Sequence, residues 1–265
     1  MRATGQNAAR QGGAGQASVK QVSDTTPPWA YEQPEVHPHD PRLIDQAETE
    51  RARLAELLEP WLVLEQLAQG TILAETNDEI DQVYFPVSGM VSFVMVMNDG
   101  KAIETATVGR DGVLGAAAGF GLYKSRVRCV VQLQTAALRI SAPQFRKAVA
   151  ASNGLTALCI RENEMLLAQA RITAACNALH KIEARFARWL LQTSVITDSD
   201  TIALTQEFLS EMLGVRRTSV TEVASKMQSA GIISYSRGVI RIIDRHSLEA
   251  ASCECFETMQ AQKII

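Results

Sequence analysis

The spacing of apolar residues along this chain changes from a strand-like to a helix-like period near Ile140. Upstream of that point, short segments rich in β-branched residues alternate with turn-forming residues, which is typical of a β-sandwich, barrel or roll. The run Asn98-Asp99-Gly100 between two such segments is typical of a hairpin turn. Downstream, apolar residues recur with a period of about 3.6, which predicts helices. The chain is therefore predicted to be an α+β protein, with a β-rich part followed by a helical part.

The sequence divides into segments that differ in composition and in the spacing of their apolar residues. Residues 1–45 are rich in Gly, Ala, Gln, Ser and Pro and have no apolar period, so they are predicted to form a disordered or loosely docked extension. A β-rich segment spans 46–152, a long helix 153–180, a helical unit ending in a hairpin 181–250, and a C-terminal tail 251–265. The strands are predicted at 71–75, 80–85, 90–97, 102–108, 129–133 and 137–140. The helices are predicted at 46–59, 143–149, 155–179, 182–192, 206–213 and 216–230, with a hairpin joining 232–235 to 239–243.

The long helix carries apolar residues at heptad spacing. A repeat sustained over about three heptads is typical of a two-stranded coiled coil, and it predicts a homodimer. The alternative is a helix that lies on the core of its own domain, with small alanines allowing a close approach. The candidate dimer contacts are Leu158, Met165, Ala168, Ile172, Ala175 and Leu179.

The unit at 181–250 predicts a winged helix-turn-helix, because helix, glycine-containing turn, helix and hairpin follow in that order. Thr205 is expected to cap the first helix and Gly214 to end it. The second helix presents short polar and cationic side chains near its N-terminal end, where base edges of the major groove come within reach. Arg217 is expected to contact guanine. The full set of candidate DNA contacts is Arg216, Arg217, Thr218, Thr221, Glu222, Lys226 and Arg237, of which Arg216, Lys226 and Arg237 best suit phosphates.

The charge is distributed unevenly between the segments. The whole chain has a formal net charge of -3, which argues against histone-like or polybasic binding. Residues 181–245 hold nine cationic and seven acidic side chains. A small local excess of positive charge is what a dimeric, sequence-specific DNA binder needs. Helix-turn-helix shapes also occur inside enzymes and as protein-docking modules.

Residues 204–245, LTQEFLSEMLGVRRTSVTEVASKMQSAGIISYSRGVIRIIDR, resemble the winged helix-turn-helix of the Crp/Fnr superfamily of bacterial transcription regulators. Residues 70–121 resemble the cyclic-nucleotide-binding-type β-roll of the same superfamily. The resemblance covers about residues 50–250. It implies an N-terminal β-roll, a long dimerisation helix and a C-terminal winged helix-turn-helix. It also implies a homodimer on a two-fold-symmetric operator of double-stranded DNA, with half-sites about one helical turn apart.

The effector pocket that this resemblance implies departs from the cyclic-AMP-binding pattern. Such members use a glutamate for the ribose hydroxyl, an arginine for the cyclic phosphate and a following Ser or Thr. When this pattern is aligned with the segment that begins at Gly115, its arginine corresponds to Arg126. The glutamate position is occupied by Ala116 and the Ser or Thr position by Val127. Unsatisfied buried polar groups cost about 1–3 kcal/mol each. Cyclic AMP is therefore predicted not to be the effector, whose identity stays open.

The five cysteines are predicted to be structural or incidental, and no metal is expected. None lies before Cys129, so the N-terminal iron–sulfur cluster of Fnr-like members is not expected. Cys253 and Cys255 are too close for the usual CxxC zinc knuckle. His180 is interpreted as a core or surface histidine and not as a haem ligand. A redox role for Cys159 and Cys176 is left open.

The recognition helix also departs from well-known members of the superfamily. Thr218 stands where they have glutamate, and Glu222 stands where they have arginine. Glutamate accepts from cytosine N4 but cannot donate to guanine. The operator is therefore predicted to differ from the common family consensus.

A DNA-binding transcription regulator controlled by a signal at the β-roll is the function favoured by these patterns. RNA polymerase would be a further partner if the regulator activates transcription. The alternative is a sensor module whose helix-turn-helix docks a protein. An enzyme is not expected, because the small-residue loop before Lys124 has Tyr123 where a P-loop requires glycine. No apolar run approaches the roughly 18–20 residues of a membrane span, and residues 1–33 lack a signal-peptide core, so a cytoplasmic location is predicted.

Overall fold

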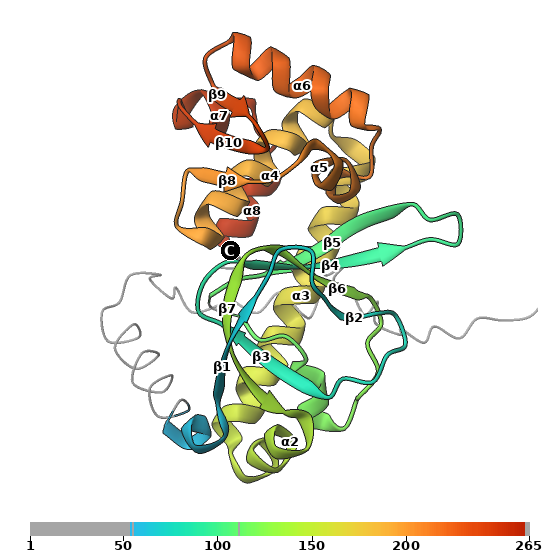
Figure 1. Ribbon diagram of the computed structural model, residues 1–265, viewed down its shortest axis with the longest axis vertical. Helices are drawn as coiled ribbons and strands as arrows, with labels where there is room; N and C mark the ends of the chain where they lie inside the picture. Colours follow the sequence, from blue (N-terminus) through green and yellow to red (C-terminus); the bar gives the residue numbers. More distant parts are fainter. Residues whose placement is uncertain (1–53, 55, 111, 263–265) are drawn as a thin grey trace, which may run out of the picture. The chain divides into compact units, whose positions relative to one another are not determined.

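A computed structural model describes Leu54, residues 56–110 and residues 112–262. The predicted extension at 1–45 and most of the predicted helix at 46–59 lie outside the described residues. Within the described part, strands dominate before Ile140 and helices after it, as the change of period predicts. Figure 1 shows the long helix α3 (Asn153–Leu179) running from the β-rich domain to the helical C-terminal domain.

Two antiparallel sheets build the β-rich domain, and they confirm the predicted β-roll class. One sheet has the strand order β1-β7-β3, and the other has the order β2-β6-β4-β5. The strands are β1 (Val63–Leu67), β2 (Ile72–Ala74), β3 (Gln82–Pro86), β4 (Met90–Val96), β5 (Ala102–Val108), β6 (Arg128–Leu133) and β7 (Thr135–Ser141).

The predicted hairpin at residues 98–100 is confirmed. Val91 of β4 lies opposite Val108 of β5, and the register closes on the turn between the two strands. The backbone N–H of Gly100 donates to the carbonyl of Met97 at 2.9 Å. Gly100 has a φ of +83°, a conformation that glycine adopts without a steric penalty.

Helices α2 (Ala142–Ala151) and α3 cover this domain together with the 3-10 helices η1 (Glu59–Trp61) and η2 (Ala116–Phe120). The hydroxyl of Ser152 caps α3 by accepting from the backbone N–H of Leu155 at 3.3 Å. The buried residues of α3 are Leu155, Cys159, Glu162, Gln169, Thr173 and Cys176. None of the helices in the described part of the chain is long and apolar enough to span a membrane.

The C-terminal domain is a winged helix-turn-helix with additions at both ends. Its three-stranded sheet has the order β8-β10-β9, so the predicted hairpin gains an edge strand. Its elements are α4 (Ile182–Thr197), β8 (Thr201–Ala203), α5 (Gln206–Leu213), α6 (Arg217–Ser229), β9 (Ile233–Ser236), β10 (Val239–Ile242), α7 (Arg245–Ala251) and α8 (Cys255–Ala261).

The segment predicted to be a C-terminal tail at 251–265 is not one in its described part. Residues up to 262 include the end of α7 and the whole of α8. Phe256 and Met259 of α8 are buried, at 4% and 0% exposure. Because those side chains cover α4, α8 is part of the domain core. Strands β1 and β8 were also not predicted, because each is short and mostly exposed and so lacks a strong apolar alternation.

Candidate nucleic-acid interface and ligand cavity

The turn between α5 and α6 is built by local sequence signals. The Thr205 hydroxyl accepts from the backbone N–H of Phe208 at 3.3 Å and so caps α5. Gly214 ends α5 in the left-handed conformation, with a φ of +61°. Helix α6 then begins at Arg217, with Arg216 at the N-cap position. The predicted helix-turn-helix is therefore present, and its second helix begins one residue later than expected.

Helix α6 has a buried face and an exposed face. Val220, Val223, Ala224 and Met227 form the buried face. Every predicted DNA contact is exposed. This holds for the residues on or beside α6 and for the one in the turn between β9 and β10. They are Arg216, Arg217, Thr218, Thr221, Glu222, Lys226 and Arg237.

The exposed cations of this surface fall into two groups. Lys226 pairs with Glu222 at 2.9 Å and with Glu183 of α4 at 3.7 Å, so its charge is largely balanced within the protein. Arg216, Arg217 and Arg237, in contrast, make no side-chain hydrogen bond or ion pair with any residue that the structure describes. Their guanidinium groups are therefore available to an external anion or base edge.

The Thr221 side chain ties the recognition helix to α5. Its hydroxyl lies 2.8 Å from Gln206 Oε1 and 3.0 Å from the carbonyl oxygen of Arg217. Gln206 is the first residue of α5, so this contact holds the N-terminal ends of the two helices together. Thr221 is thus in part a positioning residue for the surface that carries Arg217.

A cavity of about 630 Å³ lies in the β-rich domain against α3. The four residues of the predicted effector pocket all line it, namely Gly115, Ala116, Arg126 and Val127. Helix α3 supplies another wall, from Asn163, Leu166, Leu167 and Ala170. A ligand in the cavity would therefore touch the long helix directly.

The lining of this cavity is mainly apolar near η2 and carries charges of both signs at its rim. Ala116 is buried and carries no polar group, and the Ser125 hydroxyl is occupied because it donates to the carbonyl of Val127 at 2.6 Å. Burial raises the pKa of Tyr84 above its usual value. The exposed charged residues of the lining are two cations, Lys124 and Arg126, and two acids, Glu79 and Asp81. The cavity therefore suits a ligand with an apolar body and a polar end.

The predicted dimer seam of α3 is only partly on its exposed side. Leu158 packs against the β-domain core, and Ile172 packs against the cysteines near the end of α3. Met165 and Ala168 are half-buried. Ala175 and Leu179 are exposed, and Leu179 leaves 77% of its surface open to solvent.

Two exposed apolar residues of α3 lie outside that seam. Ile160 and Leu167 are 54% and 42% exposed and stand seven residues apart, so they share one side of the helix. The exposed Ala174 continues the same spacing. This second heptad series runs beside the series that begins at Leu158 and was not predicted as a dimer contact.

Comparisons with known proteins match both domains. A cyclic nucleotide-binding domain model covers residues 64–152, and a Crp-like helix-turn-helix domain model covers residues 184–251. No curated protein sequence matches the chain.

Several solved structures share the whole arrangement of domains. A CRP-family transcriptional regulator from Thermus thermophilus is 18% identical over 71% of this chain and 96% of its own, with a TM-score of 0.61. FixK2 from Bradyrhizobium japonicum is 16% identical over 72% of this chain and 98% of its own, with a TM-score of 0.62. The c-di-GMP-responsive global regulator CLP from Xanthomonas campestris is 17% identical over the same shares, with a TM-score of 0.59. At these identities the likeness is one of fold.

Proposed function

We propose that this chain, which belongs to the Crp/Fnr superfamily of DNA-binding transcription regulators, binds a two-fold-symmetric operator as a homodimer. The observation that carries the proposal is the exposed face of α6. Arg216 and Arg217 at its N-terminal end, and Arg237 in the wing, have guanidinium groups without partners in the described chain. A helix that offers cationic and short polar groups at this end suits the major groove.

Each side chain of the surface has a distinct role in this proposal. Arg217 donates to guanine O6 and N7, while Arg216 and Arg237 contact phosphates. Thr218 reaches a neighbouring base edge. Glu222 accepts from cytosine N4, and its ion pair with Lys226 restrains both side chains.

The proposed dimer forms along the exposed side of α3 that carries Ile160 and Leu167. Both residues leave apolar surface open to solvent on the helix that joins the two domains. Burying that surface against a second copy is favourable, at about 25 cal/mol for each Å². The pairing would place two copies of α6 at a spacing set by α3.

The proposed signal enters at the cavity of the β-rich domain. Leu167 both lines that cavity and carries exposed apolar surface on α3. A ligand that contacts it would favour one arrangement of the paired helices, and so one spacing of the two Arg217 side chains. Cyclic AMP is not the ligand in this proposal, because Ala116 and Val127 offer neither a carboxylate nor a hydroxyl side chain. We place this activity in the cytoplasm, with RNA polymerase as a further partner if the regulator is an activator.

Fluorescence anisotropy with operator DNA, measured over a series of salt concentrations, tests the DNA-binding role. Operator affinity should fall steeply with salt, because binding releases counterions from the phosphates. Arg217→Ala should weaken binding by about 1–3 kcal/mol, whereas Lys147→Ala on the exposed side of α2 removes the same charge and should leave it unchanged. If the helix-turn-helix instead docks a protein, neither the wild type nor Lys147→Ala will show salt-dependent DNA binding.

A further inference from the structure

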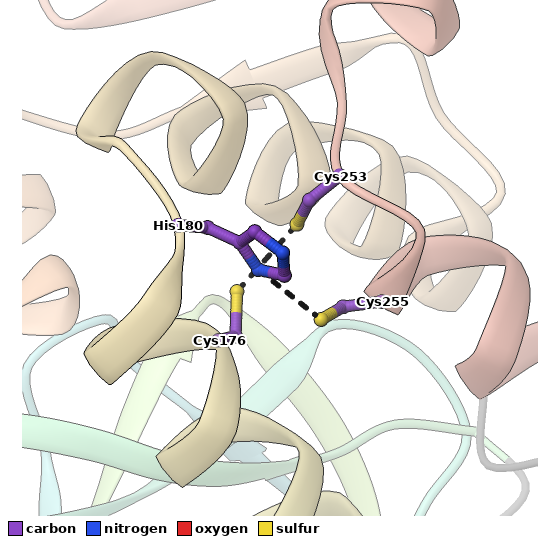
Figure 2. A group of neighbouring side chains, drawn as sticks. All are labelled: Cys176, His180, Cys253 and Cys255. Atoms are coloured by element: carbon purple, nitrogen blue, oxygen red, sulfur yellow. Dashed lines mark hydrogen bonds between the residues drawn. The ribbon is translucent and has the colours of Figure 1, made fainter.

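Three thiols and one imidazole gather where α3 ends and the C-terminal helices begin (Figure 2). Cys176 lies in the last turn of α3, and His180 follows that helix directly. Cys253 lies between α7 and α8, and Cys255 is the first residue of α8. Their candidate ligand atoms all lie within 4.8 Å of one another. Sequence spacing alone did not predict this group.

Two distances within the group match the coordination shell of one ion. Cys176 Sγ lies 3.6 Å from Cys253 Sγ, and His180 Nδ1 lies 3.6 Å from Cys255 Sγ. Tetrahedral zinc, with Zn–S bonds of about 2.3 Å and Zn–N bonds of about 2.0–2.1 Å, separates its ligand atoms by about 3.5–3.8 Å. An iron–sulfur cluster would hold the ligands of different irons farther apart, because bridging sulfides lie between the metals.

The four side chains come from ordered elements. Cys176 and His180 are four residues apart, so they lie on the same side of the helix end, and the backbone N–H of His180 donates to the carbonyl of Cys176 at 3.0 Å. Cys253 and Cys255 are held by α8, since the backbone N–H of Phe256 donates to the carbonyl of Cys253 at 3.2 Å. The buried Phe256 anchors that helix in the domain core. Ordered secondary structure therefore holds both pairs of side chains.

The imidazole is oriented as in known zinc sites. Its Nε2 lies 3.1 Å from Glu254 Oε1, while its Nδ1 faces Cys255. A carboxylate on one ring nitrogen sets the tautomer that leaves the other nitrogen free to bind a metal.

Two buried arginines supply the charge that a thiolate site needs. Arg185 and Arg188 of α4 are 8% and 4% exposed, and neither forms a carboxylate ion pair within the described residues. The Nε atoms of both lack a hydrogen-bond partner there. The positive charge of Arg188 acts on the sulfur of Cys176. Three thiolates around a divalent ion carry one net negative charge, which these buried cations would balance.

We propose that Cys176, His180, Cys253 and Cys255 together bind one Zn²⁺ ion. The site goes beyond the proposed DNA-binding function and does not rest on it. The ion would tie α8 to the end of α3, where the chain turns at Lys181 into α4. It would thereby fix the orientation of the winged helix-turn-helix relative to α3, the proposed dimer helix.

Metal analysis of the full chain purified under reducing conditions tests this proposal. We expect about one zinc per chain, and on replacement with Co²⁺ the visible absorption of a tetrahedral site with three thiolates. X-ray absorption at the zinc edge should show three sulfur ligands and one nitrogen ligand. These measurements need no DNA, so their outcome is separate from that of the operator-binding test.

Matched variants locate the site. Cys255→Ser and His180→Ala should each weaken zinc binding by at least about tenfold, since each removes one ligand. Cys159→Ser should retain the metal, because Cys159 is equally buried but lies outside the group. His180→Cys should keep the ion, as it restores a fourth ligand at the same position.

Three results would overturn the proposal. The first is a reduced wild-type chain that takes up neither zinc nor cobalt. The second is bound iron with acid-labile sulfide. The third is zinc that is lost equally from Cys159→Ser and Cys255→Ser, which would place the ion elsewhere or make its loss a consequence of unfolding.

Discussion

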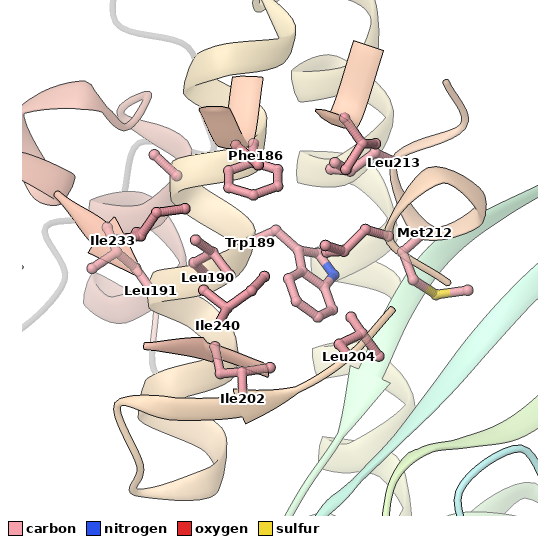
Figure 3. Packing of buried hydrophobic residues seen from close by; sticks show 14 of the residues in the cluster. Phe186, Trp189, Leu190, Leu191, Ile202, Leu204, Met212, Leu213, Ile233 and Ile240 are labelled. Atoms are coloured by element: carbon pink, nitrogen blue, oxygen red, sulfur yellow. The ribbon is translucent and has the colours of Figure 1, made fainter. Parts of the chain in front are cut away.

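The indole Nε1 of Trp189 donates a hydrogen bond of 2.8 Å to Oε1 of Glu104. Glu104 lies on β5 of the β-rich domain and Trp189 on α4, so the bond joins the two domains. The Ser92 hydroxyl donates to the other carboxylate oxygen at 2.6 Å. Figure 3 shows Trp189 among apolar side chains of the C-terminal domain, including Leu204 and Ile240. The carboxyl group is therefore held in an apolar junction.

The junction should become less stable as pH rises toward neutrality. Burial, which outweighs the hydrogen bonds from Ser92 and Trp189, raises the pKa of Glu104 to about 7. The folded state therefore binds a proton more tightly than the unfolded state. The free energy of unfolding should fall between the ordinary glutamate pKa of about 4.3 and pH 7, by up to about 3 kcal/mol, and level off above pH 7.

Denaturant unfolding of the wild type and Glu104→Gln across this pH range measures that effect. The glutamine keeps an acceptor for the indole but does not titrate, so its curve should lack the decline. A decline of equal size in both proteins would assign the pH dependence to other groups.

The turn of the helix-turn-helix rests on a close approach between Gly214 and Ile103. A Cβ added at Gly214 would lie 2.7 Å from Ile103 Cδ1, and the residue has a φ of +61°. Gly214→Ala should lower the free energy of unfolding by about 1–3 kcal/mol. Gly231→Ala is a matched control, because its φ is +74° but no atom lies within 4 Å of the added Cβ. Its cost should be only that of the backbone, about 1–2 kcal/mol.

A double-mutant cycle separates the steric part of this cost. Combined with Ile103→Ala, Gly214→Ala should cost about as much as Gly231→Ala does, since the clash is gone. If the cost of Gly214→Ala is unchanged by Ile103→Ala, the two residues do not interact as described.

The exposed apolar side of α3 predicts how the dimer can be broken. Leu167→Glu would bury a charge in the proposed interface, which should shift the protein to monomers. Sedimentation velocity measures the change, with Ala150→Glu on the exposed side of α2 as the control for added charge. Dimers that survive both substitutions would place the interface elsewhere.

Isothermal titration with cyclic AMP tests the interpretation of the cavity. Ala116 and Val127 leave the sugar and phosphate oxygens without their usual partners, at a cost of about 1–3 kcal/mol each. We expect no heat of binding at micromolar concentrations. Saturable binding at low micromolar affinity would show that other residues of the cavity replace those partners.

The elements that the sequence predicts best are those specified by neighbouring residues. Strand β5 at Ala102–Val108 and helix α5 at Gln206–Leu213 have the predicted bounds, because alternation, a threonine cap and a glycine stop act locally. The short strand β8 forms only because β10 pairs with it. Its sequence carries too little pattern to predict a strand.

The sites, too, could be predicted only where their residues are close together in the sequence. The effector residues around Ala116 and the face around Arg217 could be located from contiguous motifs. The cysteine and histidine group could not, because Cys176 and Cys253 are 77 residues apart in the chain. Each half of that group shows only a pair of candidate ligands, and only the docking of α8 against α3 and α4 brings the pairs together.

Selection of bound sequences from random double-stranded DNA tests the central claim most directly. A dimer that reads DNA with α6 should enrich an inverted repeat whose half-sites lie about one helical turn apart. The repeat should differ from the common family consensus, because Thr218 and Glu222 replace the usual glutamate and arginine. Arg217→Ala should change the preferred base within each half-site. Enrichment of the standard family palindrome would contradict the assigned base contacts, and the absence of any enriched symmetric sequence would contradict the proposed function itself.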